Sequence, residues 1–348
     1  MGRINKAVKR RLESFLHARA GRSRLARILY YGLVNPSFDR EMQAVLAGRC
    51  QFKSAEQAQG QTRSLLRRNI HRLEKGLIMR PRRSVFALEY IEETVRFVIG
   101  ACALPKDLQP RKDEMKWAVD VLTEYFSIVG QHTLVDGLRK EFAAILAQFG
   151  EDGGGLSKPY FRHENEGAQV SYDALKELAR QRRSVRWFQD RRVPRELIDK
   201  AMDIARQAPS ACNRQPFFFH VFDDAECVKQ VADLPGGTKG FSQNFPMVVA
   251  VVGELRNYYG ERDRHVIYID AALAAMSFML AAETLGLSTC CINWPDIEED
   301  ELRADQLLRL EPDQRPIFFL AVGFADKMGG IPFSQKKPLS EILKYNWE

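Results

Sequence analysis

The sequence lacks the cysteine patterns that bind zinc or build a disulfide framework. Its six cysteines stand at positions 50, 102, 212, 227, 290 and 291, with no C-x-x-C pair and no histidine at zinc-ligand spacing. Thiols used in this way fit a reducing compartment, so we expect a cytoplasmic protein. Cys290 and Cys291 are adjacent in an apolar run, a setting more typical of buried strand residues than of a redox pair.

Long apolar runs are also missing. The chain has no stretch of 18 or more apolar residues, and its N-terminus has no uninterrupted apolar core of the kind that a secretory signal needs. Apolar residues make up 45% of the chain and charged residues 28%, which are ordinary values for globular proteins. The composition therefore argues against a membrane protein and against wholesale disorder.

Positive charge gathers in the first 100 residues, which hold 21 Lys and Arg against 8 Asp and Glu, while the rest of the chain is net acidic. Residues 1–33 place apolar side chains at helical spacing and basic ones around the same turns, at Ile4, Val8, Leu12 and Phe15 and at Lys6, Lys9, Arg10 and Arg11. Such a basic amphipathic helix can bind an anionic membrane or nucleic acid. Packing on the protein itself is the commoner use of an amphipathic helix, and it is the interpretation that we favour.

Glycine and proline divide the chain into two expected domains. The segment 150–159 contains four glycines and a proline, which makes it costly to order and unable to continue a helix. We expect a basic all-α domain over 1–150, a linker over 151–170 and a second domain over 171–348. In the first domain, apolar spacing predicts helices over 54–79, 84–101, 117–129 and 133–149, with a break at Arg80-Pro81.

The second half of the chain alternates between helical and strand patterns. Apolar spacing predicts helices over 172–181, 194–207 and 268–285, and strands over 217–222, 247–252, 288–293 and 317–323. Such a mixture is typical of an α/β or α+β fold.

A basic motif lies between two of these helices. Arg182, Arg183, Ser184 and Arg186 fall within five residues. Guanidinium groups stay charged and offer forked donors that match phosphate oxygens, so the motif suits a phosphate monoester. In isolation, a solvated basic loop would be the commoner interpretation.

A polar turn follows the next helix and leads into the first expected strand. The segment 208–217 reads APSACNRQPF. Its Ser210, Asn213 and Gln215 carry hydroxyl and amide groups that can hydrogen-bond the carbonyls and ring nitrogens of a heterocycle. An ordinary helix-to-strand turn is the simpler alternative, but the combination P-S-x-x-N-x-Q-P weakens it.

These two motifs at this separation resemble the nitroreductase family of flavin enzymes. Two further elements agree, and in the family's order. Asp270-Ala271-Ala272 opens a long apolar helix that is followed by Leu285-Gly286-Leu287 and a strand, and the segment 333–342 carries a basic-P-L-x-E stretch. The resemblance spans about half of the chain, and compact members of the family lack an N-terminal half of this kind.

The resemblance implies an α+β fold, a three-layer sandwich with a central, mostly antiparallel sheet and a long core helix, here preceded by an all-α region. It implies FMN bound at the interface of a homodimer, with NADH or NADPH as electron donor. By the same resemblance the cycle is ping-pong, and a nitroaromatic, quinone or enone takes the electrons. The flavin would carry the chemistry, so we expect no catalytic acid, base or nucleophile and no metal site.

The resemblance also assigns residues to FMN, motif by motif. The ribityl phosphate would be held by Arg182, Arg183, Ser184 and Arg186, joined by Lys336 or Lys337. The ring would be met by Pro209, Ser210, Ala211, Asn213 and Gln215, and lined through the backbone of Cys291, Ile292 and Asn293. Asp270, at the start of the long helix, belongs to the same expected site.

Two departures from the family pattern bear on the substrate. Trp294-Pro295 stands where many members have small residues, so it would narrow the cavity or pack under the flavin. Only about 15 residues separate Val252 from Tyr268, where many relatives carry a longer lid, which predicts a more open site. A different function stays open at this point: a redox-sensing or targeting module whose basic half binds a membrane surface or nucleic acid.

Overall fold

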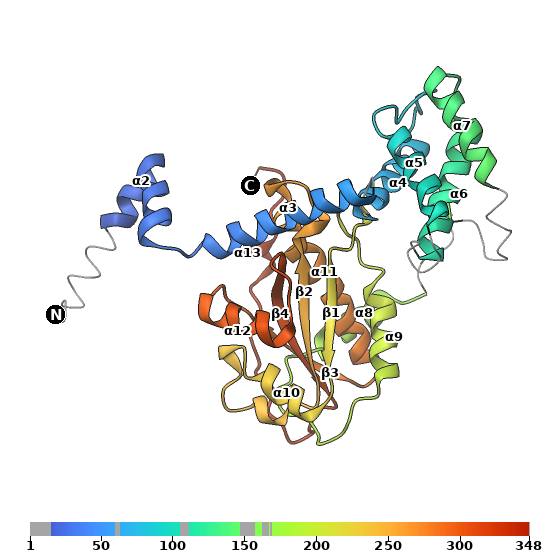
Figure 1. Cartoon of the computed structure of the whole chain (residues 1–348). Coiled ribbons are helices and arrows are strands. Elements are labelled where there is room, and N and C mark those ends of the chain that lie inside the picture. Colours follow the sequence, from blue (N-terminus) through green and yellow to red (C-terminus); the bar gives the residue numbers. More distant parts are fainter. Residues whose placement is uncertain are drawn as a thin grey trace.

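The computed structural model of the chain describes residues 15–59, 63–104, 111–146, 157–161, 167 and 169–347. A sheet domain occupies the second half of the chain, and a group of helices lies beside one end of it (Figure 1). Ile4, Val8 and Leu12 of the expected basic helix lie outside the described residues, as does most of the glycine-rich segment 150–159.

Four antiparallel strands form one sheet in the order β1-β2-β4-β3. Their bounds are Phe217–Phe222 for β1, Val248–Glu254 for β2, Ser288–Asn293 for β3 and Gln314–Gly323 for β4. In β2, Val249 and Val251 face one hydrophobic cluster, whereas Val248, Ala250 and Val252 face another. Because successive strand residues point to opposite faces, this sheet is covered on both sides. β1 and β3 have the bounds that the sequence predicts.

Two helices, α9 (Arg195–Ala205) and α11 (Val266–Thr284), pack on one face of the sheet, and α8 (Tyr172–Gln181) packs on α11. α11 is apolar nearly all round, and its Ile267, Ala271 and Phe278 are buried in the core of the domain. Among the described residues, 261–284 is the one stretch long and apolar enough, by length and composition, to cross a membrane. Half of its apolar window is buried inside the domain, as in a core helix.

The opposite face carries α10 (Ala225–Ala232) and α12 (Glu298–Leu308). Trp294 is buried there beside Phe319, and its indole N–H donates to Glu301 at 2.5 Å. Trp294 therefore fills the core under α12 rather than narrowing a cavity. Helices cover both faces of an antiparallel sheet, so the expected three-layer α+β fold is confirmed.

Four more helices form a separate hydrophobic core, which we call the helical module. They are α4 (Arg63–Leu77), α5 (Ile91–Ala103), α6 (Lys112–Ile128) and α7 (Thr133–Leu146). α5 begins at Ile91, about two turns later than predicted. The segment before it is irregular, and the Tyr125 hydroxyl donates to the Phe86 carbonyl at 2.9 Å, which holds that segment on the core.

A long helix that the sequence analysis did not predict, α3 (Asp39–Gln59), packs on the sheet domain (Figure 1). Ala44 is buried in the α11 cluster, and a Cβ at Gly48 would lie 2.8 Å from the Leu255 carbonyl carbon. Arg49 pairs with Glu261 at 2.7 Å. α3 therefore covers the short segment between β2 and α11, and the more open site expected there stays a prediction.

Candidate functional site

The segment 208–217 forms a tight turn between α9 and β1. Cys212, Asn213 and Gln215 have φ values of 54°, 53° and 52°, in the left-handed region that residues other than glycine seldom adopt. The Ser210 hydroxyl accepts from the Gln215 N–H at 3.2 Å, and Gln215 Nε2 donates to Asn213 Oδ1 at 2.9 Å. The structure thus brings together the residues predicted to meet the ring, from Pro209 to Gln215, and uses several of their polar groups to fix the turn.

Asp270 anchors this turn from the second turn of α11. Its buried Oδ2 accepts the Ala211 backbone N–H at 2.9 Å and a longer hydrogen bond from the Tyr258 hydroxyl at 3.4 Å. Burial raises the pKa of Asp270 above its ordinary value of 3.8, and the hydrogen bond from Ala211 opposes that rise. Asp270 is therefore a positioning residue for the turn.

The substitution Asp270→Asn tests this anchor through the pH dependence of stability. A carboxyl whose pKa is raised on folding holds its proton more tightly in the folded state, so stability falls as the pH rises through the raised value. We expect the free energy of unfolding of the wild type, measured relative to the Asn variant, to fall as the pH rises from below 3.8 through the raised pKa of Asp270. Urea unfolding at a series of pH values gives this difference; if it does not change with pH, the proposed burial of the charge is wrong.

The basic motif 182–186 runs beside β3, the edge strand of the sheet. Ser184 forms a parallel bridge with Thr289, and the Val185 N–H donates to the Thr289 carbonyl at 3.0 Å. Arg182 Nε and Thr289 Oγ1 are both buried without a hydrogen-bond partner among the described residues. Buried polar groups nearly always have partners, and a phosphate bound by the motif would give the Arg182 Nε the acceptor that it lacks. This part of the site fits FMN.

Arg183 has a different partner from the one predicted. Its guanidinium donates to the Pro332 carbonyl at 2.7 Å and also to the Phe333 carbonyl. This contact fastens the C-terminal segment beside the basic motif. Lys336 and Lys337 follow a few residues later and are exposed, so the segment brings two further cations toward the predicted phosphate position.

Arg182 and Arg186 diverge along the motif. Arg182 lies near Glu283 at the C-terminal end of α11: burial raises the pKa of Glu283, and the charge of Arg182 opposes that rise. Arg186 Nη1 lies 3.4 Å from the Ser184 carbonyl, and its guanidinium carbon lies 5.8 Å from the centre of the Phe241 ring. Each of the two cations therefore has its own neighbours within the chain.

The three strand residues predicted to line the ring lie in β3. Cys291 and Asn293 are exposed, whereas Ile292 is buried in the cluster under α10 and α12. Cys290 shares that cluster, and burial raises the pKa of its thiol. A buried protonated thiol is a poor nucleophile, which supports the structural interpretation of Cys290, whereas the expectation of burial is wrong for the exposed Cys291.

The two groups of predicted residues lie at opposite ends of α11. Asp270 holds the ring-type turn, and Glu283 neighbours Arg182 of the phosphate-type motif. The two acids are 13 residues apart in one helix, which is roughly 20 Å at about 1.5 Å per residue. The two groups of predicted residues, which we call the two half-sites, therefore lie far apart in one chain.

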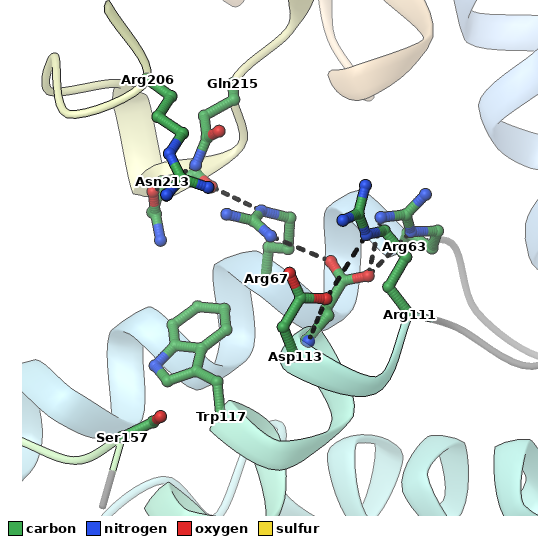
Figure 2. Close-up of a pocket in the computed structure, with 10 residues that line it drawn as sticks. Arg63, Arg67, Arg111, Asp113, Trp117, Ser157, Arg206, Asn213 and Gln215 are labelled. Atoms are coloured by element: carbon green, nitrogen blue, oxygen red, sulfur yellow. Dashed lines mark hydrogen bonds and ion pairs between the residues drawn. The ribbon is translucent and has the colours of Figure 1, made fainter. Parts of the chain in front are cut away.

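Sequence reasoning missed the part played by the helical module. Arg67 of α4 donates through Nε to the Asn213 carbonyl at 2.7 Å and pairs with Glu114 at 3.0 Å. Figure 2 shows Arg67 between the turn and α6, beside a cavity of about 530 Å³ that Trp117 and Arg206 also line. The available signal was the basic face of α4, which lies opposite its apolar face.

Comparison with known proteins agrees with the motifs. A model of the nitroreductase family matches residues 179–238 and 227–324. The putative NADH dehydrogenase/NAD(P)H nitroreductase of Methanothermobacter thermautotrophicus is 31% identical over 146 residues, which cover 42% of this chain and 72% of that protein. The FMN reductase (NADPH) of Bacillus subtilis is 28% identical over 170 residues, covering 45% of this chain and 66% of that one.

Human iodotyrosine deiodinase 1 is more distant, at 24% identity over 195 residues, covering 48% of this chain and 66% of that protein. Among solved structures, an FMN-dependent nitroreductase from Clostridium difficile has 22% identity and a TM-score of 0.42, covering 49% of this chain and 98% of that one. The sequence matches place the chain in a class of oxidoreductases. It belongs to the nitroreductase family, as its four motifs predicted.

Proposed function

We propose that this protein is an NAD(P)H-dependent FMN oxidoreductase that passes electrons to a small oxidised acceptor of the nitroaromatic, quinone or enone type. The observation that carries the proposal is the orphaned Arg182 Nε, which is buried in the motif that runs beside β3. Family membership supports it, as do the activities named for the relatives from Methanothermobacter thermautotrophicus and Bacillus subtilis. We place the reaction in the cytoplasm, with a ping-pong order of donor and acceptor.

When bound, FMN would supply the chemistry of hydride and electron transfer between a nicotinamide and the acceptor. The chain's own residues bind and orient it. Arg182, Ser184 and Arg186 would hold the phosphate with Lys336 or Lys337, while Arg183 fixes the C-terminal segment. The turn 209–215 and the backbone of 291–293 would meet the ring. Fixed N–H donors and cations stabilise negative charge on a reduced flavin without reorganisation, which is a large catalytic effect.

A homodimer would join the two half-sites. α11 carries exposed apolar side chains at i, i+4 and i+7, namely Ile269, Leu273 and Met276. A two-fold axis across the middle of this helix would place the turn of one copy beside the Arg182 motif of the other. This apolar stripe runs from Ile269 to Met276, and Met276 lies near the midpoint between Asp270 and Glu283, through which such an axis would pass. We therefore propose that two copies pack through α11 and that each FMN touches both.

The alternative function, a targeting module whose basic half binds a membrane or nucleic acid, has weaker support. In α3 and α4, Arg40, Arg49 and Arg67 are already paired with groups of the sheet domain. A face that is already paired within the chain has less charge to offer a polyanion.

The direct test is cofactor binding followed by reduction. Apoprotein mixed with FMN should retain an absorbance band at about 450 nm after gel filtration. In the absence of oxygen, NADH or NADPH should bleach this band, and a quinone added afterwards should restore the absorbance. A protein that is colourless after gel filtration with FMN would contradict the proposal.

A further inference from the structure

Helix α4 has two faces with different partners. Its apolar face, which includes Leu66, is buried in the core of the helical module. On the other face, Ser64 hydrogen-bonds Asn257, and Arg67 holds the Asn213 carbonyl. Both partners belong to the sheet domain. The polar face of α4 is therefore laid against the turn that is proposed to meet the flavin ring.

Two cavities lie along this seam between α4 and the turn. Their volumes are about 530 Å³ and about 410 Å³, and Arg63, Arg67 and Gln215 line both. Small-molecule sites commonly have volumes of about 300 to 1,000 Å³. In Figure 2, Arg206 and Gln215 come from the sheet domain, while Arg63 and Trp117 come from the facing helices. The seam is therefore large enough for a small substrate and has walls from both domains.

Arginine is in excess over acid in this lining. The larger cavity is lined by Arg63, Arg67, Arg111 and Arg206 against Asp113 and Glu114, and Asp203, outside the lining, pairs with Arg206 at 2.7 Å. Glu114 is buried and lies 2.8 Å from Arg63 and 3.0 Å from Arg67, so one carboxylate serves two guanidinium groups. The smaller cavity adds Arg214, whose buried Nε has no hydrogen-bond partner in the described part of the chain.

Further positive charge lies close to the 208–217 turn. Arg68 of α4 lies near Arg72 and Arg214; burial, followed by these two charges, lowers the pKa of Arg68. Arg214 in turn stacks on Tyr258, with its guanidinium carbon 4.6 Å from the ring centre. Like charges held this close repel one another. An anion bound in the seam would offset that repulsion.

We propose that the seam binds the anionic end of the electron acceptor, a carboxylate or phosphate on a small aromatic molecule, through Arg63, Arg67 and Arg206. The inference rests on the proposed function, because the acceptor must reach a ring that meets the same turn. Guanidinium groups suit this task, since their planar fork matches the oxygens of carboxylates and phosphates. The helical module would then be a specificity element that selects acceptors by charge.

The test compares two acceptors of nearly the same shape, 4-nitrobenzoate and the neutral 4-nitrobenzamide, on the FMN-loaded protein. Reduction of either nitro group to nitroso consumes one NAD(P)H and one proton, and releases NAD(P)⁺ and water. We expect Arg63→Gln combined with Arg206→Gln to raise the KM for 4-nitrobenzoate about tenfold or more relative to the amide. Calorimetric titration of the oxidised protein with 4-nitrobenzoate should show the same loss of affinity without turnover.

The matched control is Arg96→Gln combined with Arg303→Gln. Arg63 and Arg96 belong to the helical module and are 58% and 55% exposed, while Arg206 and Arg303 are 66% and 58% exposed and each pairs with an aspartate three residues earlier. Neither control residue lines the two cavities. The control therefore removes the same charge and similar ion pairs away from the seam.

Loss of the preference for 4-nitrobenzoate in the cavity variant, with the preference kept in the control, supports the assignment. Three results would overturn it: equal effects on both acceptors, a loss confined to the KM for NAD(P)H, or a wild type that does not prefer the anion. Failure of the proposed function has a different signature, because the wild type would then reduce neither probe.

Discussion

Replacing Arg182 and Arg186 together with alanine should raise the dissociation constant of FMN by about 10²- to 10⁴-fold. Each hydrogen bond to a charged group contributes about 1.5 to 3 kcal/mol, and two are removed. Arg182 is central to this expectation because its Nε is buried and lacks a partner among the described residues. Titration of apoprotein with FMN, followed through quenching of flavin fluorescence, measures the change.

The control for this experiment is Lys176→Ala combined with Arg180→Ala. Both residues are exposed on α8, within six positions of Arg182, so the pair removes the same charge close to the motif. We expect the control to bind FMN nearly as the wild type does, since exposed charges contribute little. If the Arg182 and Arg186 double variant is folded by circular dichroism and keeps its FMN affinity, the phosphate must bind elsewhere.

Placing two carboxylates in the α11 stripe should separate the proposed dimer and remove FMN at the same time. Leu273→Glu combined with Met276→Glu would bury two charges without partners in the interface, at a cost of several kcal/mol. Both side chains are exposed in the single chain, so the chain itself should still fold. Light scattering should report half the mass of the wild type, and FMN affinity should fall at least about a hundredfold, because the half-sites of one chain lie roughly 20 Å apart.

Ile297→Glu combined with Leu302→Glu provides the comparison for the stripe. These two apolar residues are also exposed, but they lie at α12, on the opposite side of the sheet. This variant should keep the mass and the FMN affinity of the wild type. A monomer that binds FMN as tightly as the wild type would show that one chain completes the site, and a persistent dimer would place the interface elsewhere.

The sheet domain was predictable because its signals are local. β2 is a short apolar run with both faces buried, and α11 is apolar over 19 residues, so length and composition sufficed. α12 was missed because its first turn is acidic and its buried Glu301 breaks the apolar pattern. Trp294, Arg315 and Arg40, which the fold brings to it, make that buried carboxylate tolerable.

α3 was missed for a related reason. Its apolar residues follow no single strong face, and its docking depends on close approach at Gly48 and on ion pairs such as Arg49 with Glu261. These partners lie more than 200 residues away in sequence. No window of local sequence contains them, so spacing rules cannot assign the helix to the sheet domain.

The sequence by itself determined which side chains could bind a flavin, because charge, hydrogen-bonding groups and backbone-bending residues act within a few positions of one another. Tertiary structure decided where those side chains lie. It used Arg183 to fasten the C-terminal segment, made Asp270 an anchor, and set Arg182 and the 209–215 turn at opposite ends of α11. It also brought Arg67 to Asn213 across 146 positions. Contacts between residues so far apart in sequence depend on how whole helix and sheet faces pack together, and a local sequence pattern does not encode that packing.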